Sequence, residues 1–140
     1  MVYESFSQID TEEIGFRLAG DAEPGSFYAL IGGLGAGKTA FVRGFARRLG
    51  VGAHVSSPTF AIVNEYLGGD IPLYHFDVYR IGSLEEFEST GYEDYFYGKG
   101  IVLVEWADLV EEAYPEGAVV VKFEHDPARG DDYRKITVET

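Results

Sequence analysis

Two short runs of the chain are apolar at every position, and each ends abruptly in glycine or acidic residues. Residues 27–31 read F-Y-A-L-I and lead into a glycine-rich stretch, whereas residues 101–104 read I-V-L-V and lead into Glu105. Uninterrupted apolar runs of this length are typical of strands that are buried on both faces of a sheet. The pattern therefore predicts two central strands with polar residues at their ends.

Apolar residues elsewhere recur at the three- and four-residue spacing of a helix face. One helix is predicted over residues 39–49, and Gly50 should stop it. A shorter helix is predicted near the N-terminus, with Asp10 as its N-cap and Glu13 at the capping-box position. This helix should end near Gly20.

The second half of the chain alternates short strand patterns with turn signals and short helices. Ser83 is expected to cap a helix over residues 83–89, and another short helix should cover residues 92–96. Residues 67–70, L-G-G-D, give a hairpin signal between two strands. Four further strands are predicted, at residues 60–66, 73–79, 119–123 and 133–138. Strands that alternate with helices imply one α/β domain over residues 1–140, with a central, mainly parallel sheet and antiparallel strands at its edges.

Composition and charge narrow the classes of protein to which the chain can belong. The sequence has 140 residues, no cysteine and a formal net charge of −13. Disulfides and thiolate metal sites are therefore excluded, and the surface should repel nucleic acid. No apolar run approaches the roughly 18 residues that indicate a membrane-spanning helix, and the N-terminus lacks the features of a secretion signal. We expect a cytoplasmic globular protein that binds neither membranes nor, on its own, DNA or tRNA.

A glycine-rich loop carries the strongest chemical signal. Residues 32–39 read G-G-L-G-A-G-K-T and match the pattern G-x-x-x-x-G-K-[ST] at every fixed position, between a predicted strand and a predicted helix. Glycines let the backbone approach phosphate oxygens closely, so that amide groups converge on the anion at the helix N-terminus. Lys38 should reach the β- and γ-phosphates, and Thr39 should bind Mg²⁺ through its hydroxyl. The motif predicts the three-layer fold of P-loop NTPases.

A phosphate-bound magnesium ion also needs a carboxylate at the end of a neighbouring strand. Glu105 directly follows the apolar run 101–104, which is the Walker B arrangement, and Asp77 lies on an alternating strand in H-F-D-V-Y-R. Either residue could instead be an ordinary surface carboxylate. The spacing favours the functional interpretation for Glu105 and leaves the two interpretations even for Asp77.

Several other residues give weaker signals. The segment S-S-P-T at residues 56–59 lies where P-loop NTPases often carry a switch, although residue chemistry alone favours an ordinary proline turn. His54, His75 and His125 lack metal-ligand spacing, so structural or surface roles are expected. Trp106 is expected in the core or in an interface rather than on a nucleobase. No N-K-x-D element is present, so nothing in the sequence selects guanine.

Four sequence blocks, taken together and in order, resemble those of the TsaE (YjeE) family. They are G-x-L-G-A-G-K-T, S-P-T-F with a trailing N-E-Y, H-F-D-V-Y-R and V-E-W, and they run from Gly32 to Trp106. The first block is common to many NTPases, whereas the combination is specific. The resemblance implies a weak, Mg²⁺-dependent ATPase of bacterial tRNA threonylcarbamoyladenosine (t6A) synthesis. It also implies partners of the TsaD and TsaB types, which transfer the threonylcarbamoyl group to the adenosine beside the anticodon. The ATPase would drive or reset that complex and would meet tRNA only through it.

The resemblance implies catalytic and metal-binding roles for individual residues. Lys38 and Asp77 become catalytic, with Asp77 as a catalytic or switch residue. Glu105 becomes both a catalytic residue and, with Thr39, a ligand of the metal site. Residues 57–59 become a switch-like loop.

The resemblance also implies how the nucleotide is held. In the family, an N-terminal segment and a C-terminal glycine loop hold the nucleobase, and residues 8–11 and Gly130 match these segments loosely. The residues expected to contact ATP are Thr11, Gly32, Gly35, Ala36, Gly37, Lys38, Thr39, Thr59, Trp106 and Gly130. Gly33 stands where many members have Asp, which puts the local rigidity of the loop in question.

Hydrolysis of ATP is the expected reaction, with Lys38 and Mg²⁺ stabilising the charge on the transferring phosphoryl group. Asp77 or Glu105 would orient the attacking water, and Arg80 or a partner would supply an arginine finger. Two alternatives remain open at this point. One is a small-molecule kinase, although no lid-like insertion follows Glu105. The other is a non-hydrolysing module that senses ATP and docks to partners.

Overall fold

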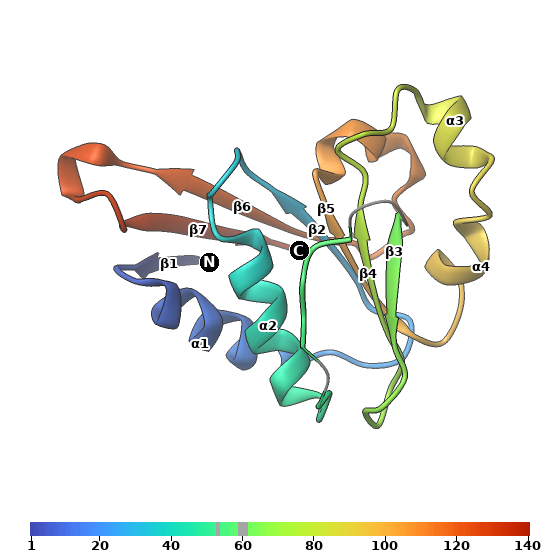
Figure 1. Cartoon of the computed structure of the whole chain (residues 1–140), viewed down its shortest axis with the longest axis horizontal. Coiled ribbons are helices and arrows are strands. Elements are labelled where there is room, and N and C mark those ends of the chain that lie inside the picture. The colour runs from blue at the N-terminus through green and yellow to red at the C-terminus, as the bar shows by residue number, and fades with distance from the viewer. Residues whose placement is uncertain (53, 59–61) are drawn as a thin grey trace.

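A computed structural model describes residues 1–52, 54–58 and 62–140, which form one sheet between two helical layers (Figure 1). Seven strands are present in these residues: β1 (Val2–Ser5), β2 (Phe27–Ile31), β3 (Val63–Tyr66), β4 (Leu73–Asp77), β5 (Ile101–Glu105), β6 (Val119–His125) and β7 (Arg134–Glu139). The helices are α1 (Gln8–Ala19), α2 (Lys38–Arg48), α3 (Leu84–Glu88), α4 (Glu93–Phe96) and the 3₁₀ segments η1 (Ala107–Ala113) and η2 (Pro127–Arg129).

The sheet is parallel at its centre and antiparallel at its edges. Its strand order is β1-β7-β6-β2-β5-β4-β3. The four neighbours β6, β2, β5 and β4 run parallel, whereas β7, β1 and β3 pair antiparallel outside them. The predicted α/β architecture is confirmed, including the hairpin between β3 and β4.

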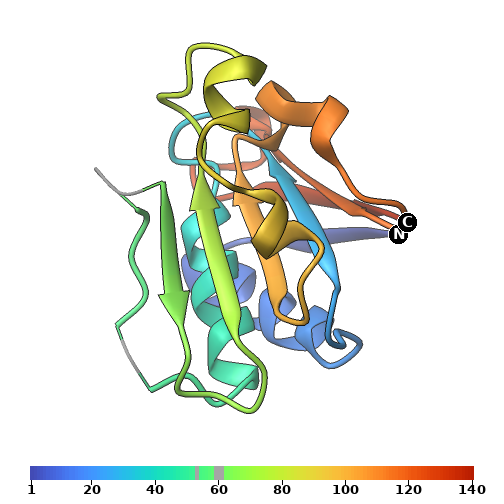
Figure 2. The same cartoon turned by 90° about the vertical axis from the view of Figure 1, so that its right-hand side faces the viewer.

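The two faces of the sheet have separate cores. Helices α1 and α2 cover one face, and α3, α4 and η1 cover the other (Figure 2). Phe41, Val42 and Phe45 of α2 are buried on the first face, as their spacing predicts. Alternate residues of the strands supply both cores: Leu103 contributes to the α2 side and Val104 to the opposite side. None of the helices in the part of the chain that the structure describes has the length and apolar character to span a bilayer.

The start of α1 corrects the sequence prediction. Ser7, rather than Asp10, is the N-cap, because its hydroxyl accepts the Asp10 N–H at 3.1 Å. Asp10 lies inside the first turn and returns a bond through Oδ2, which accepts the Phe6 N–H at 2.9 Å. The reciprocal pair therefore fixes the entry of the chain into the helix three residues earlier than predicted.

Several strand boundaries also differ from the predictions. Strand β4 stops at Asp77 instead of continuing to residue 79, because Asp77 Oδ1 accepts the Tyr79 N–H at 2.9 Å and turns the chain out of the sheet. Strand β3 begins at Val63, and residues 60 and 61 of the predicted strand lie outside the described residues. The sequence pattern did not reveal β1 or η1, which are short and only partly buried.

Two glycines let α1 and α2 pack backbone to backbone. A β-carbon on Gly44 would lie 1.8 Å from the carbonyl oxygen of Glu12, and one on Gly15 would lie 2.2 Å from that of Phe41. Neither contact is possible for a real side chain, so the crossing of these helices depends on glycine at both positions.

Gly44→Ala should therefore destabilise the protein, although alanine favours a helix interior by about 1 kcal/mol over glycine. Forcing extra volume into a packed contact typically costs 1–3 kcal/mol. Because the obstacle is backbone, we expect a loss of about 3 kcal/mol in the free energy of unfolding, or roughly 10 °C in Tm. Thermal and urea unfolding would measure it. Gly68→Ala is the matched control, because a β-carbon there meets nothing within 4 Å. Equal stability of the two variants would contradict the proposed close crossing.

Candidate functional site

Strand order and register bring three sequence-distant segments to one edge of the sheet. Strands β4, β5 and β2 are parallel neighbours, with Asp77 paired to Glu105 and Leu30 paired to Glu105 on the other side. The carboxyl ends of parallel strands are where open α/β sheets bind ligands. The glycine-rich loop that follows β2 therefore begins beside both predicted carboxylates.

The loop between β2 and α2 has the backbone that its glycines predict. Gly35 and Gly37 have φ angles of 71° and 104°, in the region that L-residues other than glycine rarely adopt. Gly37 is the N-cap of α2, so the amides of the first helical turn point into the loop. Gly32 lies close to β6, where a β-carbon would be 2.9 Å from the carbonyl oxygen of Phe123. A β-carbon at Gly33 would meet nothing within 4 Å, so the backbone there leaves room for a residue other than glycine.

Lys38 lies folded under the loop. Its Nζ donates to the carbonyl oxygen of Gly32 and, at 3.1 Å, to that of Gly33. The same ammonium group is 3.8 Å from the ring centroid of Trp106, a cation–π contact. Burial lowers the pKa of Lys38, and the negative charges of Glu105, Asp77 and Asp108 oppose that effect. A buried cation is thus held beside the carboxylates.

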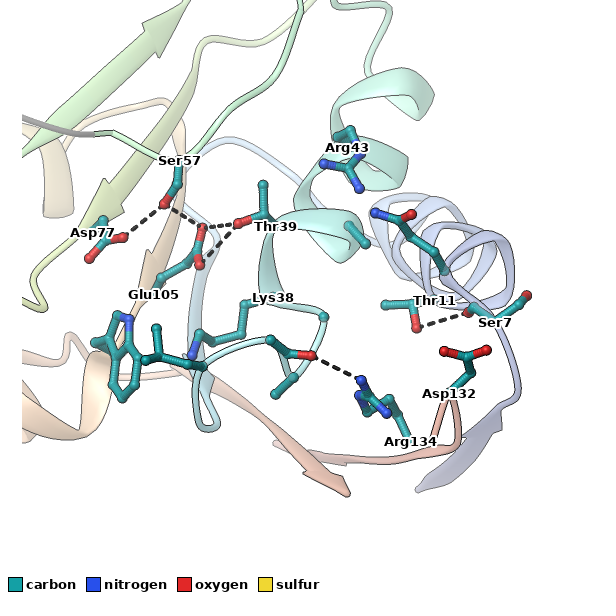
Figure 3. A pocket seen from close by; sticks show the side chains of 17 residues that line it. Ser7, Thr11, Lys38, Thr39, Arg43, Ser57, Asp77, Glu105, Asp132 and Arg134 are labelled. Carbon is teal, nitrogen blue, oxygen red and sulfur yellow. Dashed lines mark hydrogen bonds between the residues drawn. The ribbon is translucent and has the colours of Figure 1, made fainter. Parts of the chain in front are cut away.

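Glu105 is the centre of a polar cluster at the end of the sheet (Figure 3). The residue is only 3% exposed. Thr39 Oγ1 donates to its carboxylate at 3.1 and 3.3 Å, and Ser57 Oγ lies 3.4 Å from Oε2. Ser57 Oγ donates more closely to Asp77 Oδ2, at 2.8 Å, so this hydroxyl bridges the two carboxylates. The structure therefore brings the predicted residues Lys38, Thr39, Asp77 and Glu105 together.

Two contacts in this cluster were not anticipated from the sequence. Nε2 of His75, a fully buried residue, lies 2.5 Å from Glu105 Oε2. For Ser57, residue chemistry alone favours an ordinary turn and the family resemblance implies a switch-like loop, but neither predicts that its hydroxyl bridges two carboxylates. The sequence signal for His75 was its place two residues before Asp77, since alternate residues of a strand point to the same face.

A cavity of about 460 Å³ runs from this cluster along the loop to α1 (Figure 3). At its far end lie Thr11 of α1 and Arg134, whose guanidinium donates to the Gly35 carbonyl oxygen at 3.0 Å. The residues that line the cavity are Ser7, Gln8, Thr11, Leu34, Gly35, Ala36, Gly37, Lys38, Thr39, Ala40, Arg43, Ser57, Asp77, Glu105, Trp106, Asp132 and Arg134.

Two of the predicted nucleotide contacts, Gly32 and Gly130, do not line the cavity. Gly32 is linked to the lining through its carbonyl oxygen, which accepts a bond from Lys38. A third predicted contact, Thr59, lies outside the described residues. Gly130 follows η2 in the β6–β7 connection, but Asp132 and Arg134 are the residues of that connection that reach the cavity. The residues of this connection that line the cavity therefore lie two and four positions after Gly130.

The oxygen atoms at the sheet edge fit a magnesium ion. Among the residues that the structure describes, no group of three or more His, Cys, Asp or Glu side chains could hold a metal alone. Magnesium does not require one, because it typically binds one or two carboxylates together with substrate phosphates and water. Ligands at right angles in its octahedral shell lie about 3 Å apart. The distances of 3.1 and 3.3 Å between Thr39 Oγ1 and the Glu105 oxygens match that spacing.

Comparisons with known proteins agree on one family. A family model described as "Threonylcarbamoyl adenosine biosynthesis protein TsaE" matches residues 5–136. A "tRNA threonylcarbamoyladenosine biosynthesis protein TsaE" from Bacillus subtilis is 46% identical over 91% of this chain and 78% of its own length. Its namesake from Treponema pallidum is 40% identical over 96% of both chains. A crystal structure of B. subtilis YdiB superposes with a TM-score of 0.80 at 38% identity, covering 99% of this chain and 83% of the other.

The match runs from the last residue of β1 to the middle of β7, and so includes every described residue that lines the cavity. The sequence blocks, the sheet and the relatives therefore lead to the same assignment. This chain belongs to the TsaE family.

Proposed function

We propose that this protein is the Mg²⁺-dependent, ATP-binding and ATP-hydrolysing component of t6A synthesis, acting in the cytoplasm. One observation carries the proposal: Lys38 and Thr39, at the start of α2, share a single cavity with Asp77 and Glu105. The names of the family and of its relatives support the place in t6A synthesis. The shared cavity supports the proposed binding and hydrolysis of ATP.

The glycine loop would hold the triphosphate. The amides of the first turn of α2 have no acceptor within the helix, so they would donate to phosphate oxygens, assisted by the helix dipole. Lys38 would exchange its bonds to Gly32 and Gly33 for bonds to the β- and γ-phosphates. The exchange moves a desolvated cation from two neutral carbonyl groups onto an anion, which favours binding.

Thr39 and Glu105 would hold the magnesium ion, and Asp77 would orient the attacking water. Bound there, the ion would supply Lewis-acid stabilisation of charge on the γ-phosphoryl group. Glu105 is nearly inaccessible and already accepts three side-chain contacts, whereas Asp77 is half-buried and faces the cavity. This difference favours Asp77 as the residue that reaches water. Ser57 would transmit a change at either carboxylate to the segment before β3.

The far end of the cavity would receive the adenosine. Thr11, Gln8 and Asp132 offer hydroxyl, amide and carboxylate groups there. Such groups can accept and donate bonds to a base or a ribose. Thr11 and Glu105 line the same cavity, so a nucleotide that lies along the loop would reach both.

Proteins of the TsaD and TsaB types are the proposed partners, and tRNA would be met only through them. Arg80 lines a neighbouring cavity rather than the one that holds Lys38 and Thr39. A partner is therefore the better source of a transition-state arginine, which would explain slow turnover by the isolated chain.

A small-molecule kinase is the second candidate function. The neighbouring cavity, of about 410 Å³, shares Ser57, Asp77 and Trp106 with the first and extends to Arg80. An acceptor hydroxyl bound there would approach the γ-phosphate from the side of Asp77. A phosphorylated product that requires an added acceptor would establish this activity, whereas release of inorganic phosphate alone supports hydrolysis.

Lys38→Ala should weaken ATP binding about 100-fold, since a hydrogen bond to a charged group contributes about 1.5–3 kcal/mol. Isothermal titration calorimetry would measure the change. Lys99→Ala is a control, because Lys99 is exposed and lies outside the cavity. Unchanged affinity and turnover in the Lys38 variant would show that the nucleotide binds elsewhere.

Asp77→Asn and Glu105→Gln should separate the two carboxylates. Asp77→Asn should keep Mg²⁺-dependent ATP binding but lower kcat by about 100-fold or more, as loss of a general base does. Glu105→Gln should instead remove the Mg²⁺ dependence of binding. Single-turnover hydrolysis and ATP affinity with and without EDTA distinguish these results. The reverse pattern would exchange the roles assigned here.

Nucleotide should control assembly. A tagged form of this chain should capture TsaD- and TsaB-type partners more strongly with ATP than with ADP or no nucleotide, and the partners should raise its ATPase rate. Pull-down and phosphate-release assays measure the two effects. Partners that bind equally in all three conditions, without stimulation, would count against coupling.

A further inference from the structure

A buried histidine lies directly behind the carboxylate of Glu105. His75 is in the middle of β4, fully enclosed, with apolar neighbours in sequence on the opposite face of the strand. Its Nε2 contacts Glu105 Oε2 at 2.5 Å. The other ring nitrogen, Nδ1, has no hydrogen-bond partner among the described residues. Within the part of the chain that the structure describes, Glu105 is therefore the one polar partner of this ring.

Packing alone does not account for an imidazole at this position. A leucine or methionine would fill a similar volume without the cost of burying a polar ring. The ring also cannot serve as a magnesium ligand where it lies, because its Nε2 is directed at Oε2 and magnesium prefers oxygen ligands. What the imidazole adds is a hydrogen-bond donor behind the carboxylate.

The contacts of the two carboxylate oxygens are unequal. Among residues 1–52, 54–58 and 62–140, Oε2 contacts His75, Thr39 and Ser57, whereas Oε1 contacts only Thr39, at 3.3 Å. In the ionised form that would bind magnesium, the carboxylate carries no proton, so Nε2–H would donate to Oε2. The bond from His75 thus fixes Oε2, and both oxygens stay within reach of Thr39 Oγ1, at 3.1 Å for Oε2 and 3.3 Å for Oε1.

We propose that His75 is a positioning residue that fixes Glu105 in the orientation required for magnesium. The inference rests on the proposed function of Thr39 and Glu105. A glutamate side chain has three rotatable bonds, and ordering it costs conformational entropy. With His75 in place, that ordering is complete before the ion arrives. Two residues on the same face of β4 then act at the site. His75 orients the carboxylate of Glu105, and Asp77, two residues later, faces the cavity.

If His75 has this role, replacing it should change the affinity for Mg²⁺ rather than the affinity for ATP alone. Groups that hydrogen-bond to a metal ligand typically change metal affinity 10–100-fold when they are replaced. His75→Leu should therefore raise the Mg²⁺ concentration needed for half-maximal ATP binding by about that factor. Affinity for ATP in EDTA should stay the same, because the loop and Lys38 are untouched. His75→Gln keeps an N–H near the position of Nε2 and should restore most of the Mg²⁺ dependence.

Trp106 provides the readout, since it is the one tryptophan of the chain and it contacts Lys38. Its fluorescence would be followed during Mg²⁺ titration at fixed ATP, and electron paramagnetic resonance would count bound Mn²⁺ directly. Phe76→Leu is the matched control: Phe76 is buried next to His75 but faces the other core. This control should lose stability without a change in the Mg²⁺ midpoint.

The results separate failure of this inference from failure of the proposed function. A wild-type protein with no Mg²⁺-dependent ATP binding would overturn both. Normal wild-type behaviour, with an unchanged Mg²⁺ midpoint in His75→Leu, would overturn the role of His75 alone. Equal shifts of the Mg²⁺ midpoint in His75→Leu, His75→Gln and Phe76→Leu would show that the midpoint follows stability alone. That result would also overturn the positioning role of His75.

A wild-type measurement decides the question if His75→Leu does not fold. In protein labelled with ¹⁵N-histidine, the Nε2 resonance of His75 should move when Mg²⁺ is added to the ATP complex, while those of exposed His54 and His125 stay in place. A His75 resonance that does not respond to Mg²⁺ would overturn the inference.

Discussion

Burial of one carboxylate organises this site. Glu105 ends a strand whose every residue is buried, and an ionised group in such a place is stable only when donors surround it. Its donors come from three different segments: Thr39 from α2, Ser57 from the segment before β3, and His75 from β4. Because the buried carboxylate of Glu105 needs hydrogen-bond donors, the start of α2 after the glycine loop, the segment at Ser57 and the edge hairpin all meet at this residue.

The opposite end of the cavity depends on helix packing rather than on charge. The close crossing at Gly15 and Gly44 brings α1 down onto α2. A β-carbon on Gly37 would lie 3.4 Å from Thr11 Cγ2, which shows how near α1 comes to the phosphate loop. Thr11 is itself held by a 2.7 Å bond to Ser5 of β1. The edge strand and the helix crossing together place the surface on which we propose that the nucleoside lies.

The sequence predicts the parts of the site that have local signatures. The spacing of the glycine motif located Lys38 and Thr39, and the apolar run before Glu105 located the carboxyl end of β5. Both signals depend on neighbours in the chain, so one sequence is sufficient to detect them. The same is true of Ser83, whose hydroxyl accepts the Glu86 N–H at 3.1 Å as the capping pattern predicts.

Contacts between distant segments were beyond that kind of prediction. His75 lies 30 positions from Glu105, and only the parallel register of β4 and β5 brings them together. Asp132 and Arg134 enter the cavity because the β6–β7 connection folds back, which composition does not reveal. Asp10 was a plausible N-cap, but the helix begins three residues earlier, where the Ser7 hydroxyl accepts the Asp10 N–H and the Asp10 carboxylate accepts the Phe6 N–H.

Trp106 shows what this arrangement requires of the backbone. Among the described residues it is the one non-glycine with a positive φ, at 61°. The left-handed conformation costs an ordinary L-residue about 1–2 kcal/mol, and glycine would be free of most of that strain. A tryptophan is nevertheless present, and its ring lies against Lys38 and Tyr79. The strain at Trp106 therefore lowers the free energy of unfolding of the protein. The same backbone conformation places an aromatic ring beside Lys38, so this position favours the geometry of the site over stability.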